Sequence, residues 1–171
     1  MLCASFELVR EGALQDFLSI HGSTEWRTYL ALHATFQGLP DGELREEVGE
    51  VLARSEQNFV AGIAAAYERL TALLGYRLRP DAGVTFETVA LLTGATLRGL
   101  VTTALSTPDV ATRRVSAAPF GGAEAAEWSL PSLGIATTLF AFLEPDPGIE
   151  WDDDRAAKVR RALEAEEWES G

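Results

Sequence analysis

The sequence predicts an all-α fold of about seven helices, and three observations carry that prediction. Apolar residues recur at steps of three and four through most of the chain, which is the spacing of one face of a helix. Clusters of proline and glycine separate these segments. No stretch alternates apolar and polar residues over the length of a strand. A chain of 171 residues also favours one domain, so we expect residues 1–171 to fold as a single helical unit.

Composition and charge exclude several classes of function. The formal net charge is −12 and Lys158 is the only lysine, whereas a duplex-binding surface needs clustered basic residues. We therefore expect no direct nucleic-acid binding by this chain. Cys3 is the only cysteine and cannot form an internal disulfide. No apolar run approaches the ~20 residues that span a bilayer, and the N-terminus lacks a basic signal-peptide region. We therefore expect a cytoplasmic protein with no membrane contact.

The first two helices are expected over residues 4–21 and 25–37. Gly22 ends the first of them, and Ser23 or Thr24 caps the second. The apolar face of the first helix comprises Phe6, Val9, Ala13, Phe17 and Ile20.

An aromatic face marks the second helix. Its members follow one another at steps of three, four and three, and they are Trp26, Tyr29, His33 and Phe36. One interpretation is a packed core face in which a backbone carbonyl satisfies His33. Another is the wall of a small-molecule pocket, with Tyr29 and His33 as polar anchors among the rings. A metal-binding or catalytic His33 is the third, although the chain has no HExxH motif and no cluster of Cys and His.

The longest helix is expected over residues 43–74, with Asp41 as its cap and Gly49 at a bend or break. Phe59 belongs to its nearly continuous apolar stripe. Tyr67 follows a run of small residues, and its hydroxyl either reaches a pocket or lies at the surface. Gly75 then has the place of a helix-ending glycine.

The next helix is expected over about residues 85–105, capped by Thr85 and preceded by an extended segment before Pro80. It carries small residues where bulk is usual. Glycine inside a helix costs about 1 kcal/mol relative to alanine, so these positions imply a close approach by another helix or by a second copy of the chain. Thr96 either bonds back to the helix backbone or faces a ligand.

The remaining elements are a loop and two helices. Residues 106–129 are expected to form an irregular loop, weakly ordered around 113–122 and anchored by Phe120 and Trp128. The helix over residues 131–143, capped by Ser129, is apolar all round, which implies a partner on one side of it. An amphipathic helix follows Trp151, with its first acidic residues, Asp152 to Asp154, in a capping role.

Catalytic motifs are missing from the sequence. The chain contains no GxSxG, GxGxxG or Walker motif and no paired histidines. We therefore expect that the protein is not an enzyme and has neither a cofactor nor a metal site.

One stretch carries a family pattern. It consists of a G-x-x-L-R-P turn, a V-T pair, a helix and a closing R-G-L. Its residues are Gly75, Leu78, Arg79, Pro80, Val84, Thr85, Arg98, Gly99 and Leu100. This pattern resembles the C-terminal regulatory domain of the TetR family of bacterial transcription repressors. Residues 25–48, EWRTYLALHATFQGLPDGELREEV, are similar to the second and third regulatory helices of that family.

The resemblance implies an all-helical module that binds an apolar small-molecule effector and forms a homodimer through a four-helix interface. By position, helices 85–105 and 131–143 supply that interface. Its expected residues are Ala95, Gly99, Thr103, Leu133, Thr137 and Phe140. The expected effector pocket comprises Trp26, Tyr29, His33, Phe36, Phe59, Tyr67 and Thr96. The basic helix-turn-helix of the family has no counterpart in residues 1–25, so the resemblance implies DNA binding only for a longer protein.

Two alternative functions fit the same sequence. The first is a helical partner protein that heterodimerises with a full-length regulator and thereby prevents formation of its active dimer. The second is a small helical enzyme in which His33 and a carboxylate act as acid and base.

Overall fold

The computed structural model describes residues 2–119, 125–150, 152, 154–159, 161 and 162, and only the backbone of residues 2–6. Helix is the dominant structure, and seven helices within this described part confirm the all-α prediction. The named helices are α1 (Leu2–Gly22), α2 (Thr24–Gln37), α3 (Glu43–Leu73), α4 (Phe86–Ser106), α5 (Asp109–Thr112) and α6 (Leu130–Phe142). The described part of the C-terminal helix covers residues 154–159 and 161–162.

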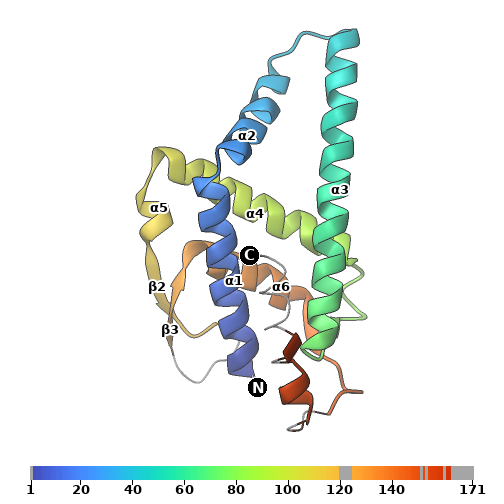
Figure 1. Ribbon diagram of the computed structural model, residues 1–171, viewed down its shortest axis with the longest axis vertical. Helices are drawn as coiled ribbons and strands as arrows, with labels where there is room; N and C mark the ends of the chain where they lie inside the picture. Colours follow the sequence, from blue (N-terminus) through green and yellow to red (C-terminus); the bar gives the residue numbers. More distant parts are fainter. Residues whose placement is uncertain (1, 120–124, 151, 153, 160, 163–171) are drawn as a thin grey trace.

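The helices form a packed body and a projecting arm (Figure 1). In the body, α4 packs against α3, α6 and α1, and α6 packs against α1. The arm consists of α2 and the N-terminal half of α3, which extend away from the body and meet at the turn between them. No residue of α2 is buried, so the arm has little core of its own.

Two apolar clusters hold the body together, and α1 and α4 contribute to both. The first contains Ala13, Val89, Ile135, Leu139 and Leu143. The second contains Phe17, Ile20, Val101 and Ala104. Burying a side chain such as that of Phe17 contributes roughly 1.5–3 kcal/mol, so these clusters fix the positions of α1, α4 and α6.

Most helix ends follow the expected local chemistry. Ser23, Thr85 and Ser129 each accept a hydrogen bond from the backbone N–H three residues later, which is the geometry of an N-cap. Gly75 has φ of 72°, a left-handed conformation that ends α3 at low cost for glycine. The expected cap Asp41 is wrong, because α3 begins after Gly42 without a side-chain cap.

The C-terminal helix closes the end of α3. Asp152 accepts a hydrogen bond from the Arg155 N–H at 2.8 Å, as a cap does. The Arg155 guanidinium donates to the carbonyls of Ala72 and Leu73, both at 3.0 Å. These carbonyls lie in the last turn of α3, where helical carbonyls lack partners from a following turn, and that of Ala72 also accepts from the Gly75 N–H at 3.3 Å.

Short strands correct the expectation that the chain contains none. β2 (Arg114–Ala117) pairs antiparallel with β3 (Ala126–Ser129) inside the segment expected to be an irregular loop. β1 (Tyr76–Leu78) pairs with β4 (Leu143–Pro145), far along the chain. Strands of three or four residues are too short for a readable alternation, and their pairing is set by tertiary contacts. Trp128, the expected anchor, is 3% exposed; Phe120 lies outside the described residues.

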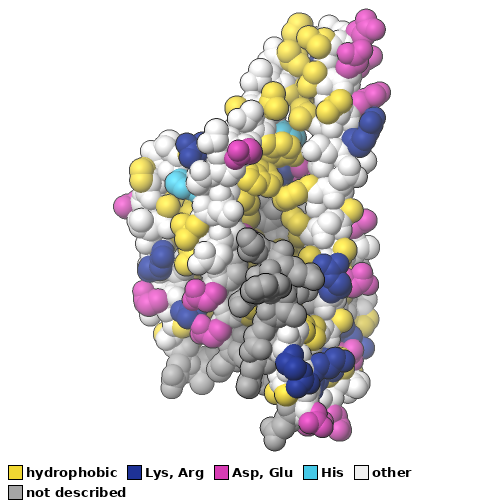
Figure 2. Space-filling view, in the orientation of Figure 1, with side chains coloured by type: hydrophobic (Ala, Val, Ile, Leu, Met, Phe, Trp, Pro, Cys, Tyr) yellow, Lys and Arg dark blue, Asp and Glu magenta, His cyan; other side chains and the backbone are white. Residues whose placement is uncertain are grey.

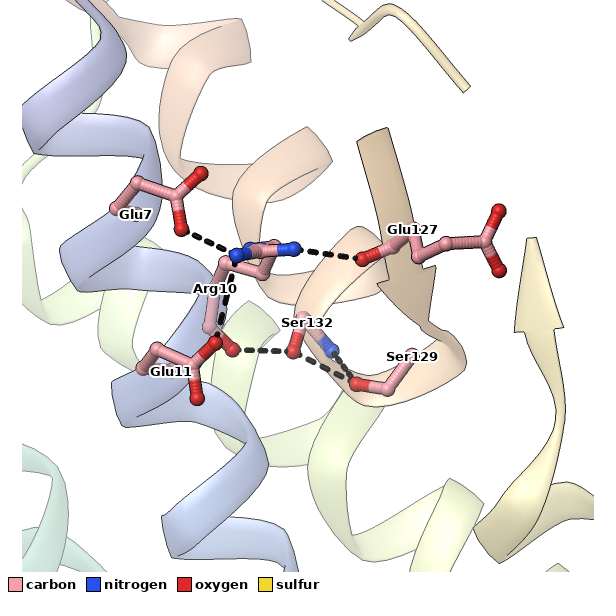
Figure 3. A network of polar contacts seen from close by, with 6 residues as sticks. All are labelled: Glu7, Arg10, Glu11, Glu127, Ser129 and Ser132. Atoms are coloured by element: carbon pink, nitrogen blue, oxygen red, sulfur yellow. Dashed lines mark hydrogen bonds and ion pairs between the residues drawn. The ribbon is translucent and has the colours of Figure 1, made fainter. Parts of the chain in front are cut away.

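A polar network joins α1 to the start of α6 (Figure 3). Arg10 donates to the Glu127 carbonyl at 3.0 Å and forms an ion pair with Glu7. The Ser132 hydroxyl, which is fully buried, donates to the Arg10 carbonyl at 2.6 Å and lies 2.7 Å from the Ser129 hydroxyl. Each buried hydroxyl therefore has partners, and the network holds α1 against the N-terminal end of α6.

α4 is an apolar helix, and much of its surface is accessible. Its most apolar 18-residue window has a mean hydropathy of 1.3, and 28% of that window is buried. By length and composition alone the helix could cross a membrane, contrary to the expectation that no segment approaches this length. One such helix is weak evidence for a membrane span, because the core helix of a soluble protein passes the same test.

Candidate functional site

A cavity of about 720 Å³ lies between α1, α3, α4 and α6. Trp26 of α2, Tyr76 of β1 and Leu143 of β4 contribute to its lining, and most of its other lining side chains are apolar. Small-molecule sites have volumes of about 300–1,000 Å³ and the same mainly apolar character. The cavity therefore has the size and lining of a ligand site.

The hydroxyl groups of the cavity wall already have hydrogen-bond partners, either another hydroxyl or a backbone carbonyl. The Tyr67 hydroxyl donates to the Thr93 hydroxyl at 3.1 Å, and Thr93 donates to backbone carbonyls of its own helix. Thr71 bonds in the same way to the Tyr67 carbonyl at 2.7 Å. Burial raises the pKa of Tyr67 despite the bond to Thr93, so this hydroxyl stays protonated. These groups add polarity to the wall without adding charge.

Arg98 is the one basic residue in the described lining, and Glu56 neutralises it. Two guanidinium nitrogens of Arg98 meet the two Glu56 oxygens at 2.7 Å each, a bidentate ion pair between α4 and α3. The Tyr29 hydroxyl donates to Glu56 at 2.8 Å and brings α2 into the same network. The Arg98 hydrogen bonds, which outweigh burial, lower the pKa of Glu56. The network thus joins three helices around one ionised carboxylate.

Asp16 is the acidic residue of the described lining. It has no hydrogen bond or ion pair to any described residue, and burial raises its pKa from the usual 3.8. The residue nevertheless remains accessible. Asp16 is therefore an exposed residue whose side chain also lines the cavity.

The structure separates the seven residues expected in the effector pocket. Trp26, Phe59 and Tyr67 line the cavity. Tyr29 and His33 lie outside the lining, with their ring centroids 4.5 Å apart. The expectation that a carbonyl satisfies His33 is not met, because its Nε2 is buried without a partner among the described residues.

The other two expected pocket residues also lie elsewhere. Phe36 is near the far end of α2, where the Arg45 guanidinium lies 4.8 Å from its ring centroid. Thr96 bonds back to the Leu92 carbonyl at 2.9 Å, one of the two outcomes expected for it. Neither residue lines the cavity.

The aromatic face of α2 packs mainly against α3. The Trp26 ring meets the Phe59 ring edge-on, with centroids 5.3 Å apart, and Tyr29 meets Trp26 in the same way. Figure 2 shows hydrophobic side chains gathered between α2 and α3. The face is therefore a packed one that reaches the cavity through Trp26.

One face of α4 is exposed and carries apolar or small side chains. We call it the α4 face, and it comprises Thr88, Leu91, Leu92, Ala95, Gly99, Thr102 and Thr103. Leu91 and Leu92 are 49% and 42% exposed. Three expected interface residues, Ala95, Gly99 and Thr103, thus lie together on an open surface.

The expected interface residues of α6 are less uniform. Thr137 is exposed and Leu133 is half-buried. Phe140 lines the cavity, and its ring centroid lies 5.9 Å from that of Tyr76. Within the chain, α6 approaches α4 closely at Gly134, where an added Cβ would lie 2.9 Å from the Thr96 methyl. At Gly99 an added Cβ would meet nothing within 4 Å.

Among the residues that the sequence interpretation missed are the three charged residues of this site, Asp16, Glu56 and Arg98. Asp16 had a readable signal, because it interrupts the apolar row of Val9, Ala13 and Ile20 at helical spacing. Glu56 and Arg98 had none, because the two residues lie 42 positions apart and meet only through the packing of α3 on α4.

Within the described part of the chain, no group of three or more His, Cys, Asp or Glu residues could hold a metal ion. Comparison of the chain with protein-family models, with curated proteins and with solved structures found no match.

Proposed function

We propose that this chain is a small-molecule-sensing and homodimerising domain of a TetR-like transcriptional regulator, which acts by binding and not by catalysis. The observation that carries the proposal is the mainly apolar cavity of about 720 Å³. Four helices surround it, so a molecule bound there would contact every main element of the body. A cavity of this kind suits a small, largely apolar effector.

The homodimer in this proposal is supported by the α4 face. Contiguous exposed apolar surface on a folded domain marks an interaction site more often than a free surface. The α4 face joins exposed leucines to small residues, a combination that lets a second helix approach closely. In the proposed dimer, α4 and α6 of each copy pack into a four-helix interface. This chain does not contact DNA itself; DNA binding would need a helix-turn-helix domain in a longer protein. The proposed site of action is the cytoplasm.

Binding of a neutral apolar reporter tests the cavity. N-phenyl-1-naphthylamine fluoresces strongly in apolar surroundings, and we expect a saturable rise on titration with the protein. Ala66→Trp places an indole in the cavity, because Ala66 lines it. We expect this variant to raise the Kd at least about tenfold, which corresponds to about 1.4 kcal/mol.

Ala65→Trp is the matched control for this titration. Ala65 is the neighbouring residue of α3, is exposed and does not line the cavity. We expect the Kd of Ala65→Trp for the reporter to stay within about twofold of that of the original protein. A twofold change corresponds to less than about 0.5 kcal/mol. Failure of the original protein to give saturable binding would contradict the sensing function.

A further inference from the structure

We propose that the cavity binds a lipophilic organic cation, an amine or quaternary ammonium on an apolar body, whose positive charge lies against Asp16. The inference rests on the proposed function of the cavity as an effector site. It goes further by naming the chemical class of the effector and the residue that selects it.

The placement of Asp16 on α1 directs its carboxylate toward the cavity. Val9, Ala13 and Ile20 lie on the same helical row, at steps that put them on one face with Asp16. All four residues line the cavity, and Ala13 and Ile20 are buried. A carboxylate thus occupies a position where the pattern of the helix calls for an apolar side chain.

The charges in the described lining leave Asp16 uncompensated. Arg98 and Asp16 are the two charged residues there. Arg98 cannot serve Asp16, because Glu56 occupies its guanidinium with two bonds of 2.7 Å. The Tyr67 hydroxyl, which faces Asp16 from α3, is bonded to Thr93. The described cavity therefore carries one net negative charge, and a ligand that brings one positive charge balances it.

The walls suit the apolar body of such a cation. Aromatic side chains from four elements contribute to the lining, namely Trp26, Phe59, Tyr67, Tyr76 and Phe140. Aromatic faces attract organic cations as well as apolar groups, by about 0.5–2 kcal/mol per contact. An anionic ligand would meet the same walls but would be repelled by Asp16.

The charge of the whole chain acts in the same direction. A net charge of −12 attracts cations toward the protein and repels anions over a distance comparable to the Debye length. This long-range effect does not select a site, so a test must separate it from the local effect of Asp16.

Tetraphenylphosphonium and tetraphenylborate provide the test, because they share size and shape and differ in the sign of the charge. 4-Phenylbutylamine and 4-phenylbutyrate form a second, slimmer pair. We expect isothermal titration calorimetry to give a Kd at least about tenfold lower for the cation of at least one pair, equivalent to about 1.4 kcal/mol. Asp16→Asn should remove most of this preference, because it removes the carboxylate charge and keeps the size of the side chain.

Asp81→Asn is the control for long-range charge. It changes the net charge of the chain by the same amount, and Asp81 is exposed and outside the lining. The cation preference should persist in this variant. Equal affinity for both members of both pairs, or an equal loss in the two variants, would overturn the inference and leave the neutral reporter result intact. Absence of binding by the reporter and by every ion would overturn the proposed function as well.

Discussion

At the scale of single residues, two carboxylates of the site respond to pH in opposite ways. Hydrogen bonds from Arg98 lower the pKa of Glu56 below 4.5. Its ionised form therefore adds stability above that pH, and this contribution is lost as the pH falls through the lowered pKa. Burial raises the pKa of Asp16 above 3.8, so its ionised form costs stability at neutral pH and the cost disappears in acid.

Two neutral amides should separate these effects. At pH 7 we expect Glu56→Gln to lower the free energy of unfolding by about 1–2 kcal/mol, because Arg98 loses its charged partner. Asp16→Asn should raise the melting temperature at the same pH. The Asp16→Asn difference should shrink as the pH falls through the raised pKa of Asp16, whereas the Glu56→Gln difference should persist to lower pH and shrink only as the pH falls through the lowered pKa of Glu56. Urea denaturation and thermal melts at several pH values measure them.

Asp41, which forms an exposed ion pair with Arg45, provides the control substitution for those measurements. Its oxygen lies 3.7 Å from Arg45, and its side chain is fully exposed. An exposed ion pair contributes little, so Asp41→Asn should change stability by less than about 0.5 kcal/mol. A stabilising Glu56→Gln or a destabilising Asp16→Asn at pH 7 would contradict the assigned directions.

At the scale of elements, the sequence predicted those features that depend on residues close together in the chain. Ser23, Thr85 and Ser129 are capping residues whose chemistry depends only on the next few residues, and all three cap helices. The strands were missed because each needs a partner that the local pattern does not name. Tyr76 pairs with Pro145, for example, after a helical segment, a hairpin and a second helix have intervened.

The spacing of α4 and α6 depends on a glycine that the sequence analysis did not single out. An added Cβ at Gly134 would lie 2.9 Å from the Thr96 methyl. We expect Gly134→Ala to lower stability by about 1 kcal/mol, because overpacking of about 1–3 kcal/mol exceeds the gain of about 1 kcal/mol in helix propensity. Thr96→Ser removes the methyl and keeps a hydroxyl for Leu92, so Gly134→Ala should become neutral or stabilising in that background.

A double-mutant cycle by urea denaturation measures this coupling. The expected interaction energy lies within the range of about 0.5–3 kcal/mol found for residues in contact. Equal effects of Gly134→Ala in the two backgrounds would show that the helix spacing does not depend on the missing Cβ.

At the scale of the whole molecule, the sequence predicted the helical fold but only part of the cavity. Trp26 was named from the aromatic face of its helix, Phe59 from the apolar stripe of the next helix, and Tyr67 from the position of its hydroxyl after a run of small residues. The opposite wall comes from α1. The sequence shows Asp16 interrupting an apolar row, but the cavity that it lines exists only once α1 packs against α4 and α6 and faces α3 across the cavity. The neutralisation of Arg98 by Glu56 likewise exists only in three dimensions, so the charge of the cavity could not be read from the sequence.

The proposed dimer makes its own prediction. Gly99→Trp places an indole on the α4 face, where an added side chain has open space in the single copy. We expect it to weaken dimerisation at least about tenfold, or about 1.4 kcal/mol, without loss of helicity. Light scattering after size exclusion measures the mass, and circular dichroism measures helix content.

Gly62→Trp is the matched control for Gly99→Trp. Gly62 is also a helical, exposed glycine whose added Cβ would meet nothing within 4 Å, but it lies on α3. This variant should remain a dimer. A clean monomer for the unsubstituted chain at micromolar concentration would contradict the homodimer itself.

α4 presents its two sides to two different environments. Thr93, Leu97 and Arg98 line the cavity, whereas Leu92, Ala95 and Gly99 lie on the accessible side. An α-helix moves as a rigid rod, so a shift that accommodates a molecule on one side displaces the other side by a similar distance. Thermodynamic linkage is reciprocal. In the proposed dimer, the effector would therefore change the affinity between the subunits by the same factor by which assembly changes the affinity for the effector.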